Sequence, residues 1–246
     1  MSGFSVSRYA PKRSAWGRLT ARDSVVRRLD WPLLGSAIAL SLIGSALVYS
    51  ATRGRDALTH GDPYYFLLRH ALNTGIGFAL MVGTIWLGHR TLRGAVPILY
   101  GLSVLLVLAV LTPLGATVNG AHAWIIIGGG FSLQPSEFTK ITIILVMAMI
   151  LAARVDAGDQ VHPDHRTVAK ALGLALLPMV IVMGMPDLGS VMVMAVIVLG
   201  VLLASGASNR WIFGLLGAGV AGAVAVWQLG LLDDYQIARF AAFANP

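Results

Sequence analysis

Residues 138–153 read FTKITIILVMAMILAA, and this stretch decides the fold class. From Ile141 to Leu151 the side chains are apolar on every side, with Thr142 the single polar residue. A membrane β-strand would instead alternate apolar and polar residues over about 9–11 positions. A helix that is apolar all round belongs in a protein core or a membrane. The stretch therefore predicts a membrane-spanning helix and argues against a β-barrel.

The composition of the whole chain agrees with this interpretation. Of its 246 residues 57% are hydrophobic and only 12% are charged, against roughly 25% charged in a typical soluble domain. The mean hydropathy is +0.76. These values exclude a soluble enzyme, a disordered chain and a small secreted scaffold. The chain has no cysteine, which excludes disulfides, thiol catalysis and cysteine-ligated metals. We therefore predict an all-α, polytopic transmembrane helical bundle.

Seven segments are long and apolar enough to cross a bilayer, which takes about 17–25 residues each. The predicted spans are Trp31–Ala51, Leu67–Gly88, Gly94–Pro113, Phe138–Ala153, Val168–Met185, Leu188–Ala204 and Trp211–Leu232. Only Pro186 and Asp187 separate the fifth and sixth spans, so one bent segment is the alternative to two helices with a tight turn.

The basic residues predict the orientation of these spans. Residues 1–30 form a polar, basic segment without an apolar run, and we expect it to be a cytoplasmic tail. Placing the N-terminus inside puts most of the 18 Lys and Arg residues on the inner side, as the positive-inside rule requires. The net charge of +7 is therefore explained by the topology of the chain. The same basic residues can also bind anionic lipid headgroups. The charge gives no reason to invoke nucleic acid. The loop at 113–136 then lies outside.

Three ionisable residues, Glu137, Lys140 and Asp187, lie in or at the mouth of spans, where a charge needs a partner or a wet cavity. Glu137 and Lys140 share one helical face and can pair. That pair either fixes helix packing or forms the polar floor of a cavity that positions a charged substrate. Asp187 follows a proline, so it is either a helix N-cap or a second partner of Lys140.

Two further features of the predicted outer face attract attention. Residues 119–132 are apolar and glycine-rich, and we expect a re-entrant or interfacial loop. Its Trp124 is either an interfacial anchor or a surface on which a sugar stacks, whereas the lone His122 does not suggest catalysis. Arg239 can approach a phosphate bidentately, the alternative being a helix end that snorkels into the headgroups.

The order of several motifs identifies a family resemblance. Gln134-Pro135-Ser136-Glu137 with Lys140, then Pro186-Asp187-Leu188-Gly189, then Tyr235-Gln236 with Arg239 and Asn245-Pro246, resemble the SEDS family of RodA, FtsW and SpoVE proteins. Asn119-Gly120-Ala121 before Trp124 fits as well, and the resemblance extends over residues 30–246. Ser50-Ala51-Thr52 looks closer to RodA than to FtsW.

The resemblance implies a peptidoglycan glycosyltransferase of the bacterial cytoplasmic membrane. Such a protein polymerises lipid II on the outer face, here during cell elongation and cell-shape maintenance, together with a class B penicillin-binding protein that cross-links the product. The substrate-cavity residues carried over are Gln134, Ser136, Glu137, Lys140, Asp187 and Arg239, with Trp124 beside them.

The resemblance also implies about ten spans and a catalytic Asp in a large outer loop. That loop would follow Pro246, the last residue of the sequence, so the catalytic residue is expected beyond Pro246 and none is assigned within the chain. Residues 31–246 are therefore expected to be the N-terminal part of a membrane domain that stops before the loop, inactive alone.

Two departures and two alternatives accompany this interpretation. Besides the missing loop, Ala123 stands where the family often has Arg, so no role of that Arg transfers.

Glycan transfer needs a base, and it needs charge stabilisation for the leaving pyrophosphate. Arg239, Lys140 or a divalent cation can supply the charge stabilisation. No cofactor and no metal-binding cluster is identified in the sequence. The alternatives are a lipid II flippase and a non-catalytic scaffold for a transpeptidase.

Overall fold

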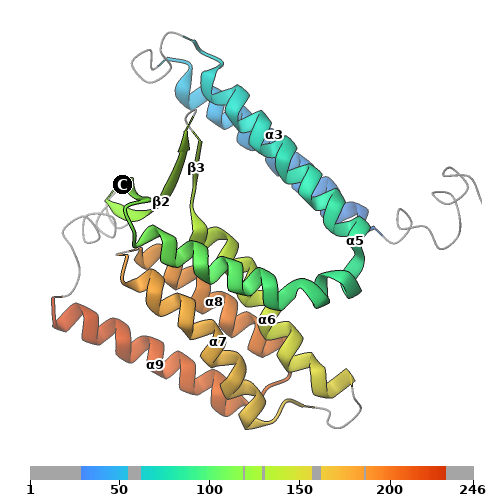
Figure 1. Cartoon of the computed structure of the whole chain (residues 1–246), viewed down its shortest axis with the longest axis vertical. Helices are drawn as coiled ribbons and strands as arrows, with labels where there is room; N and C mark the ends of the chain where they lie inside the picture. Colours follow the sequence, from blue (N-terminus) through green and yellow to red (C-terminus); the bar gives the residue numbers. More distant parts are fainter. Residues whose placement is uncertain are drawn as a thin grey trace, which may run out of the picture. The chain divides into compact units, whose positions relative to one another are not determined.

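The computed structural model describes residues 29–54, 62–118, 120–128, 131–156, 162–185 and 187–230. Each of the seven predicted spans coincides for most of its length with a helix (Figure 1), and residues 231–232 of the last span lie outside the described residues. The helices are α3 (Trp31–Thr52), α5 (Tyr65–Val110), α6 (Pro135–Asp156), α7 (His165–Met183), α8 (Leu188–Ala204) and α9 (Asn209–Gln228). Three short strands are β1 (Gly115–Val118), β2 (Ala121–Gly128) and β3 (Phe131–Leu133). Most of the basic tail, and the segment from residue 231 to Pro246 with Arg239, lie outside the described residues.

Helix α5 contains two of the predicted spans. It runs for 46 residues and is interrupted at Gly88, where φ is 72° and ψ is 160°. Five helices of the described chain are long and apolar enough to cross a membrane, α5 among them, and the 17-residue α8 is a shorter apolar helix. The chain divides near this break into two compact units, residues 1–89 and 90–246.

Replacing Gly88 by alanine is expected to destabilise the protein by about 1–3 kcal/mol. A Cβ at Gly88 meets nothing within 4 Å, so the cost comes only from a backbone conformation that is essentially restricted to glycine. Gly83 is the matched control, because it lies in the regular part of α5 and also has free space around it. Gly83→Ala should stabilise the helix by up to about 1 kcal/mol. Thermal unfolding in detergent measures the stability of both variants. Equal changes in stability would contradict the glycine-restricted backbone conformation at Gly88.

The first unit pairs α3 with the first half of α5. Asp30 caps α3 by accepting a hydrogen bond from the backbone N–H of Leu33 at 3.1 Å. None of the residues of α3 is buried, which is typical of a helix whose surroundings are lipid. A side chain at Gly44 would come within 3.7 Å of the His70 Nε2 atom, so glycine permits the close approach of these two helices.

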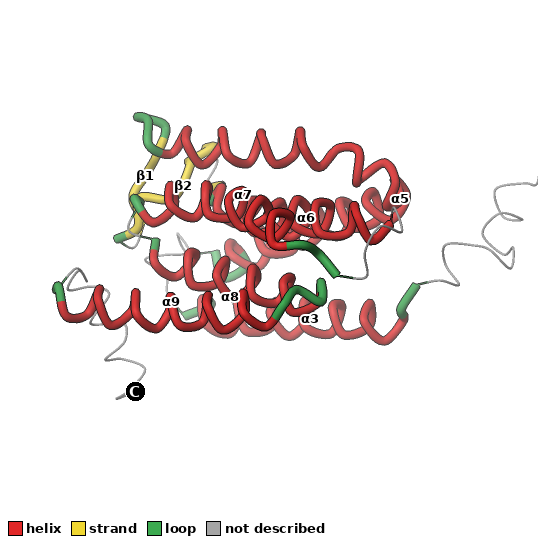
Figure 2. The backbone as a smooth tube through the Cα atoms, turned by 90° about the horizontal axis from the view of Figure 1, so that it is seen from below, coloured by secondary structure: helices red, strands yellow, loops and turns green. Residues whose placement is uncertain are grey.

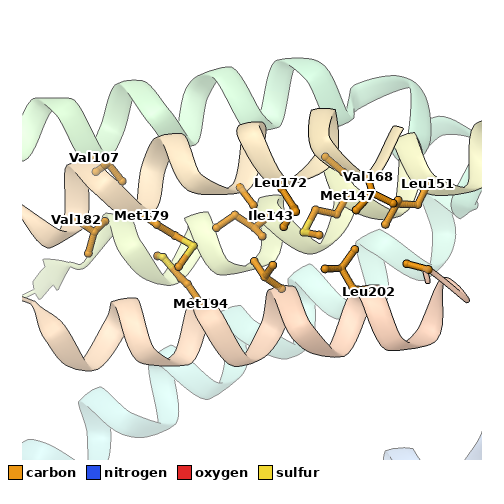
Figure 3. Packing of buried hydrophobic residues seen from close by; sticks show 14 of the residues in the cluster. Val107, Ile143, Met147, Leu151, Val168, Leu172, Met179, Val182, Met194 and Leu202 are labelled. Atoms are coloured by element: carbon orange, nitrogen blue, oxygen red, sulfur yellow. The ribbon is translucent and has the colours of Figure 1, made fainter. Parts of the chain in front are cut away.

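The core of the second unit forms around α6. This helix packs against α7 and α8 and also touches β2. Ile143 and Met147 of α6 are fully buried together with Met194 and Leu202 of α8 (Figure 3). Figure 2 shows α6, α7, α8 and α9 running alongside one another. The hydroxyls of Ser103 and Thr142 form a buried hydrogen bond of 2.7 Å between α5 and α6, of a kind worth about 0.6 kcal/mol in membranes.

The segment expected to be an irregular loop instead forms a three-stranded antiparallel sheet in the order β1-β2-β3. The expected irregular backbone was wrong, because successive β-branched residues from Ile125 to Ile127 favour an extended strand. Pairing also satisfies backbone groups that a loop near a membrane would leave unbonded. The expected interfacial position of the segment stays a prediction. Gly128, with φ of 100°, follows the irregularity in the register after Ile126, as expected for a bulge next to a turn. The fold remains a helical membrane bundle with a small sheet at one end.

Candidate functional site at the start of helices α6 and α8

Helix α6 begins with an ion pair. Pro135 occupies its first position, where the missing N–H costs nothing. Lys140 Nζ lies 2.6 Å from Glu137 Oε1, one turn apart on the same face. The predicted pair is therefore confirmed. The Lys140 side chain is 16% exposed and that of Glu137 is 56% exposed, so the ammonium group sits deeper than its carboxylate partner.

Helix α8 begins beside α6, and two polar contacts join the two starts, next to the bond that caps α8. Asp187 Oδ1 accepts from the Ser190 backbone N–H at 3.1 Å, and its Oδ2 accepts from Gln134 Nε2 at 3.0 Å. The buried hydroxyls of Ser136 and Ser190 lie 3.3 Å apart. Gln134, Ser136, Glu137, Lys140, Asp187 and Ser190 are called the α6–α8 polar cluster below.

Asp187 is an N-cap, as one of the two sequence interpretations predicted. The other, in which Asp187 pairs with Lys140, was wrong for the described chain: the Asp187 oxygens bond Gln134 and Ser190, whereas the ammonium bonds Glu137. The physical reason is local, because capping holds the carboxylate against the first turn of its own helix. Lys140 therefore has one carboxylate partner among the described residues and keeps donor capacity for a ligand.

Replacing Asp187 by alanine is expected to cost about 1–2 kcal/mol, because it removes both the cap and the bond to Gln134. Asp187→Asn should stay close to wild type, since asparagine caps helices as well as aspartate does and the Gln134 amide can turn to offer its oxygen. Thermal unfolding in detergent distinguishes the two variants. An alanine variant as stable as the asparagine variant would show that the cap contributes nothing.

The sheet is fastened to the end of α5 by His122, a role that sequence reasoning missed. Its Nε2 lies 3.0 Å from the Val110 carbonyl oxygen and its Nδ1 3.0 Å from the Thr117 hydroxyl. Because a carbonyl only accepts, Nε2 carries the proton and, in the neutral ring, Nδ1 accepts from Thr117. No pattern in the sequence signals this contact, since it depends on the register of β1 against β2.

The other predicted site residues are less closely connected to the α6–α8 polar cluster. Trp124 is half-buried on β2, opposite Ala116 of β1, and the adjacent Ala123 is buried. Within the described part of the chain, no three His, Cys, Asp or Glu side chains come together as metal ligands would. The cluster offers a cation, two carboxylates, an amide and hydroxyls at one end of a bundle, a set suited to a polar, charged ligand.

Two sequence predictions about the site fall at the end of the chain. Arg239 lies outside the described residues, which end at residue 230. Pro246 lies outside them as well, and the catalytic Asp was expected beyond it. The structure therefore gives neither residue a place beside the α6–α8 polar cluster, and both expectations stay predictions.

Comparison with known proteins places this arrangement in a family. A family model for FtsW, RodA and SpoVE, described as "Cell cycle protein", matches residues 31–246. The chain belongs to the FtsW/RodA/SpoVE family. A probable peptidoglycan glycosyltransferase FtsW from Geobacter sulfurreducens is 32% identical over 222 residues, which are 90% of this chain and 58% of the relative. The Escherichia coli O157:H7 FtsW is 32% identical over 225 residues, 91% of this chain and 52% of the relative.

Solved structures of the FtsW/RodA/SpoVE family agree. A peptidoglycan synthase complex, reported for its structural coordination of polymerization and crosslinking, contains a chain with 27% identity and a TM-score of 0.64. The match covers 88% of this chain and 59% of that one. The Thermus thermophilus rod shape determining protein RodA matches with 29% identity and a TM-score of 0.53, over 72% of this chain and 58% of that one. The predicted helical membrane fold is confirmed, and the chain spans little more than half of these relatives.

Proposed function

We propose that this chain contributes the α6–α8 polar cluster to a peptidoglycan glycosyltransferase that polymerises lipid II. The observation that carries the proposal is the half-buried, ion-paired Lys140 at the mouth of a span, inside a family whose curated relatives are named peptidoglycan glycosyltransferases. The Lys140 ammonium group has N–H donors besides the one that bonds Glu137, and a charged ligand can accept from them.

The chemistry of the cluster suits a lipid-linked pyrophosphate. The N-terminus of α6 carries a partial positive charge that favours anions, and Lys140 adds a full charge one turn into the helix. In this proposal Lys140 stabilises the charge that develops on the leaving pyrophosphate, and Glu137 holds the ammonium in place. Gln134, Ser136 and Asp187 position the first turn.

The proposal extends to the rest of the predicted site and to its surroundings. Arg239 would add a bidentate contact to phosphate, and Trp124 would stack on a sugar ring. A catalytic Asp beyond Pro246 would supply the base for the acceptor hydroxyl. The active face is the outer face of the cytoplasmic membrane. The partner is a class B penicillin-binding transpeptidase, a choice supported by the related complex reported to coordinate polymerization with crosslinking.

The proposed activity has two candidate cellular roles, cell elongation and cell division. The sequence predicts a RodA-like role in cell elongation, and the likeness to Thermus thermophilus RodA supports it. A division role is the second candidate, because the relatives that match 90% of the chain are named FtsW. A fluorescent fusion separates the two: localisation along the side wall supports elongation, and localisation confined to the septum overturns it.

The test of the activity uses a hybrid protein, because the chain spans 58% of the Geobacter sulfurreducens FtsW. In this FtsW hybrid, residues 31–246 replace the matching part of that relative. Proteoliposomes with fluorescent lipid II are assayed for glycan chains and for movement of lipid II between leaflets. Chains without movement support the glycosyltransferase. Movement without chains supports the flippase, and neither, in a folded hybrid, supports the scaffold.

A further inference from the structure

Strand β2 is more exposed at the tip of the β2–β3 hairpin than in its middle. In its middle, Ala123 is buried and Ile125 packs against the core of the bundle. At the tip, Ile126 and Ile127 are 62% and 67% exposed. Neighbouring residues of a strand point to opposite faces, so β2 places one exposed isoleucine on each face of the tip, with Ser132 of β3 opposite Ile126. A hairpin that faces water on one side normally has a polar face there.

The whole segment around the sheet also lacks charge. Residues 94–136 contain no Asp, Glu, Lys or Arg, although they include all three strands and their connections to α5 and α6. Exposed apolar surface of this kind usually marks a binding surface for protein or membrane. A hairpin tip with an exposed isoleucine on each face and no charge is better suited to lipid, which surrounds it, than to a protein partner that would cover one face.

The position of the sheet points to the same environment. Only Gln134 separates the end of β3 at Leu133 from the start of α6 at Pro135, so the sheet begins at the level where the spanning helices end. Figure 1 shows β2 and β3 running across the axes of α6, α7 and α8 rather than continuing them. Strands in this orientation extend sideways from the end of the bundle.

From these observations we propose that the hairpin tip, residues 126–128, is immersed in the lipid leaflet at the sheet end of the bundle. The occupant of this surface is the boundary between lipid headgroups and acyl chains, where apolar side chains of interfacial segments bury. The tip would thereby anchor the sheet, and with it the His122 contact to α5. This surface is separate from the α6–α8 polar cluster and does not depend on the proposed activity.

The absence of cysteine allows a direct test by single-cysteine labelling. Ile126→Cys and Ile127→Cys are labelled with bimane in the full chain and reconstituted in phosphatidylethanolamine–phosphatidylglycerol vesicles. Quenching is measured with a doxyl-labelled lipid and with aqueous iodide. Leu105→Cys is the lipid reference, because Leu105 is exposed within a span of α5. His162→Cys is the water reference, because His162 is exposed just before α7.

We expect both tip positions to lose fluorescence to the doxyl lipid nearly as strongly as position 105, and to resist iodide as position 105 does. Iodide quenching like that at position 162, at either tip position, would overturn the proposal. So would emission that neither quencher reduces, because it would indicate a protein contact. Both isoleucines are largely exposed, so cysteine removes little packing, and an unchanged thermal transition confirms that each labelled chain is folded.

Discussion

Gly115→Ala is expected to destabilise the protein by about 3 kcal/mol, at the upper end of the cost of overpacking. Gly115 is the first residue of β1, and a Cβ there would overlap the Val110 carbonyl oxygen and lie 2.6 Å from His122 Nε2. These are the two atoms of the hydrogen bond that fastens the sheet to α5. Because the closest overlap is with backbone, the end of α5 must shift and that hydrogen bond is lost.

Gly101→Ala is the matched control for this substitution, since a Cβ at Gly101 meets nothing within 4 Å. It should be neutral or stabilising by up to about 1 kcal/mol, as for glycine within a helix. His122→Ala should cost about 1 kcal/mol, the usual value of one hydrogen bond. Thermal and denaturant unfolding in detergent measure all three. A Gly115→Ala variant as stable as wild type would show that β1 does not approach α5 as described.

Lys140→Met is expected to lower lipid II polymerisation by the FtsW hybrid about a hundredfold, the size of effect seen when one donor to a developing negative charge is removed. Methionine keeps much of the length and volume of the lysine side chain, so the ion pair is lost with little change in packing. Lys170→Met is the matched control: Lys170 is an exposed lysine on α7, and its loss should leave the rate unchanged. Chain formation from fluorescent lipid II measures the rates.

An exchange of the two charges tests what the ion pair does. The double variant Glu137→Lys/Lys140→Glu keeps a pair at the same spacing, so a purely structural bridge would be restored. We expect this variant to fold like wild type and to remain inactive, because the cation moves to the more exposed position. Recovery of activity would contradict a chemical role for Lys140 and would leave the pair with a role in packing only.

The helices could be predicted from the sequence because hydropathy is a property of each segment alone. The predicted span Leu188–Ala204 has the bounds of α8. Helix α6 begins three residues before the predicted Phe138. Its first turn is polar, and a span that is bounded by hydropathy leaves out a polar first turn. The ion pair between Glu137 and Lys140 was also predictable, since spacing within one helix fixes it.

The contacts between segments could not be predicted in the same way. Gln134 and Asp187 are 53 residues apart in sequence, and the bond between them depends on how α6 and α8 pack. The sheet was missed because apolar residues next to glycines suit a membrane loop as well as a short hairpin. Gly115 and His122 acquire their importance only from the register of β1 against β2.

The most direct test of the central claim is polymerisation of fluorescent lipid II by the FtsW hybrid, in vesicles and beside the parent Geobacter sulfurreducens FtsW. If residues 31–246 contribute a working substrate site, the hybrid forms glycan chains at a rate comparable to the parent, and Lys140→Met abolishes nearly all of them. A hybrid that folds and inserts like the parent but forms no chains would contradict the account. So would one whose activity is unaffected by Lys140→Met.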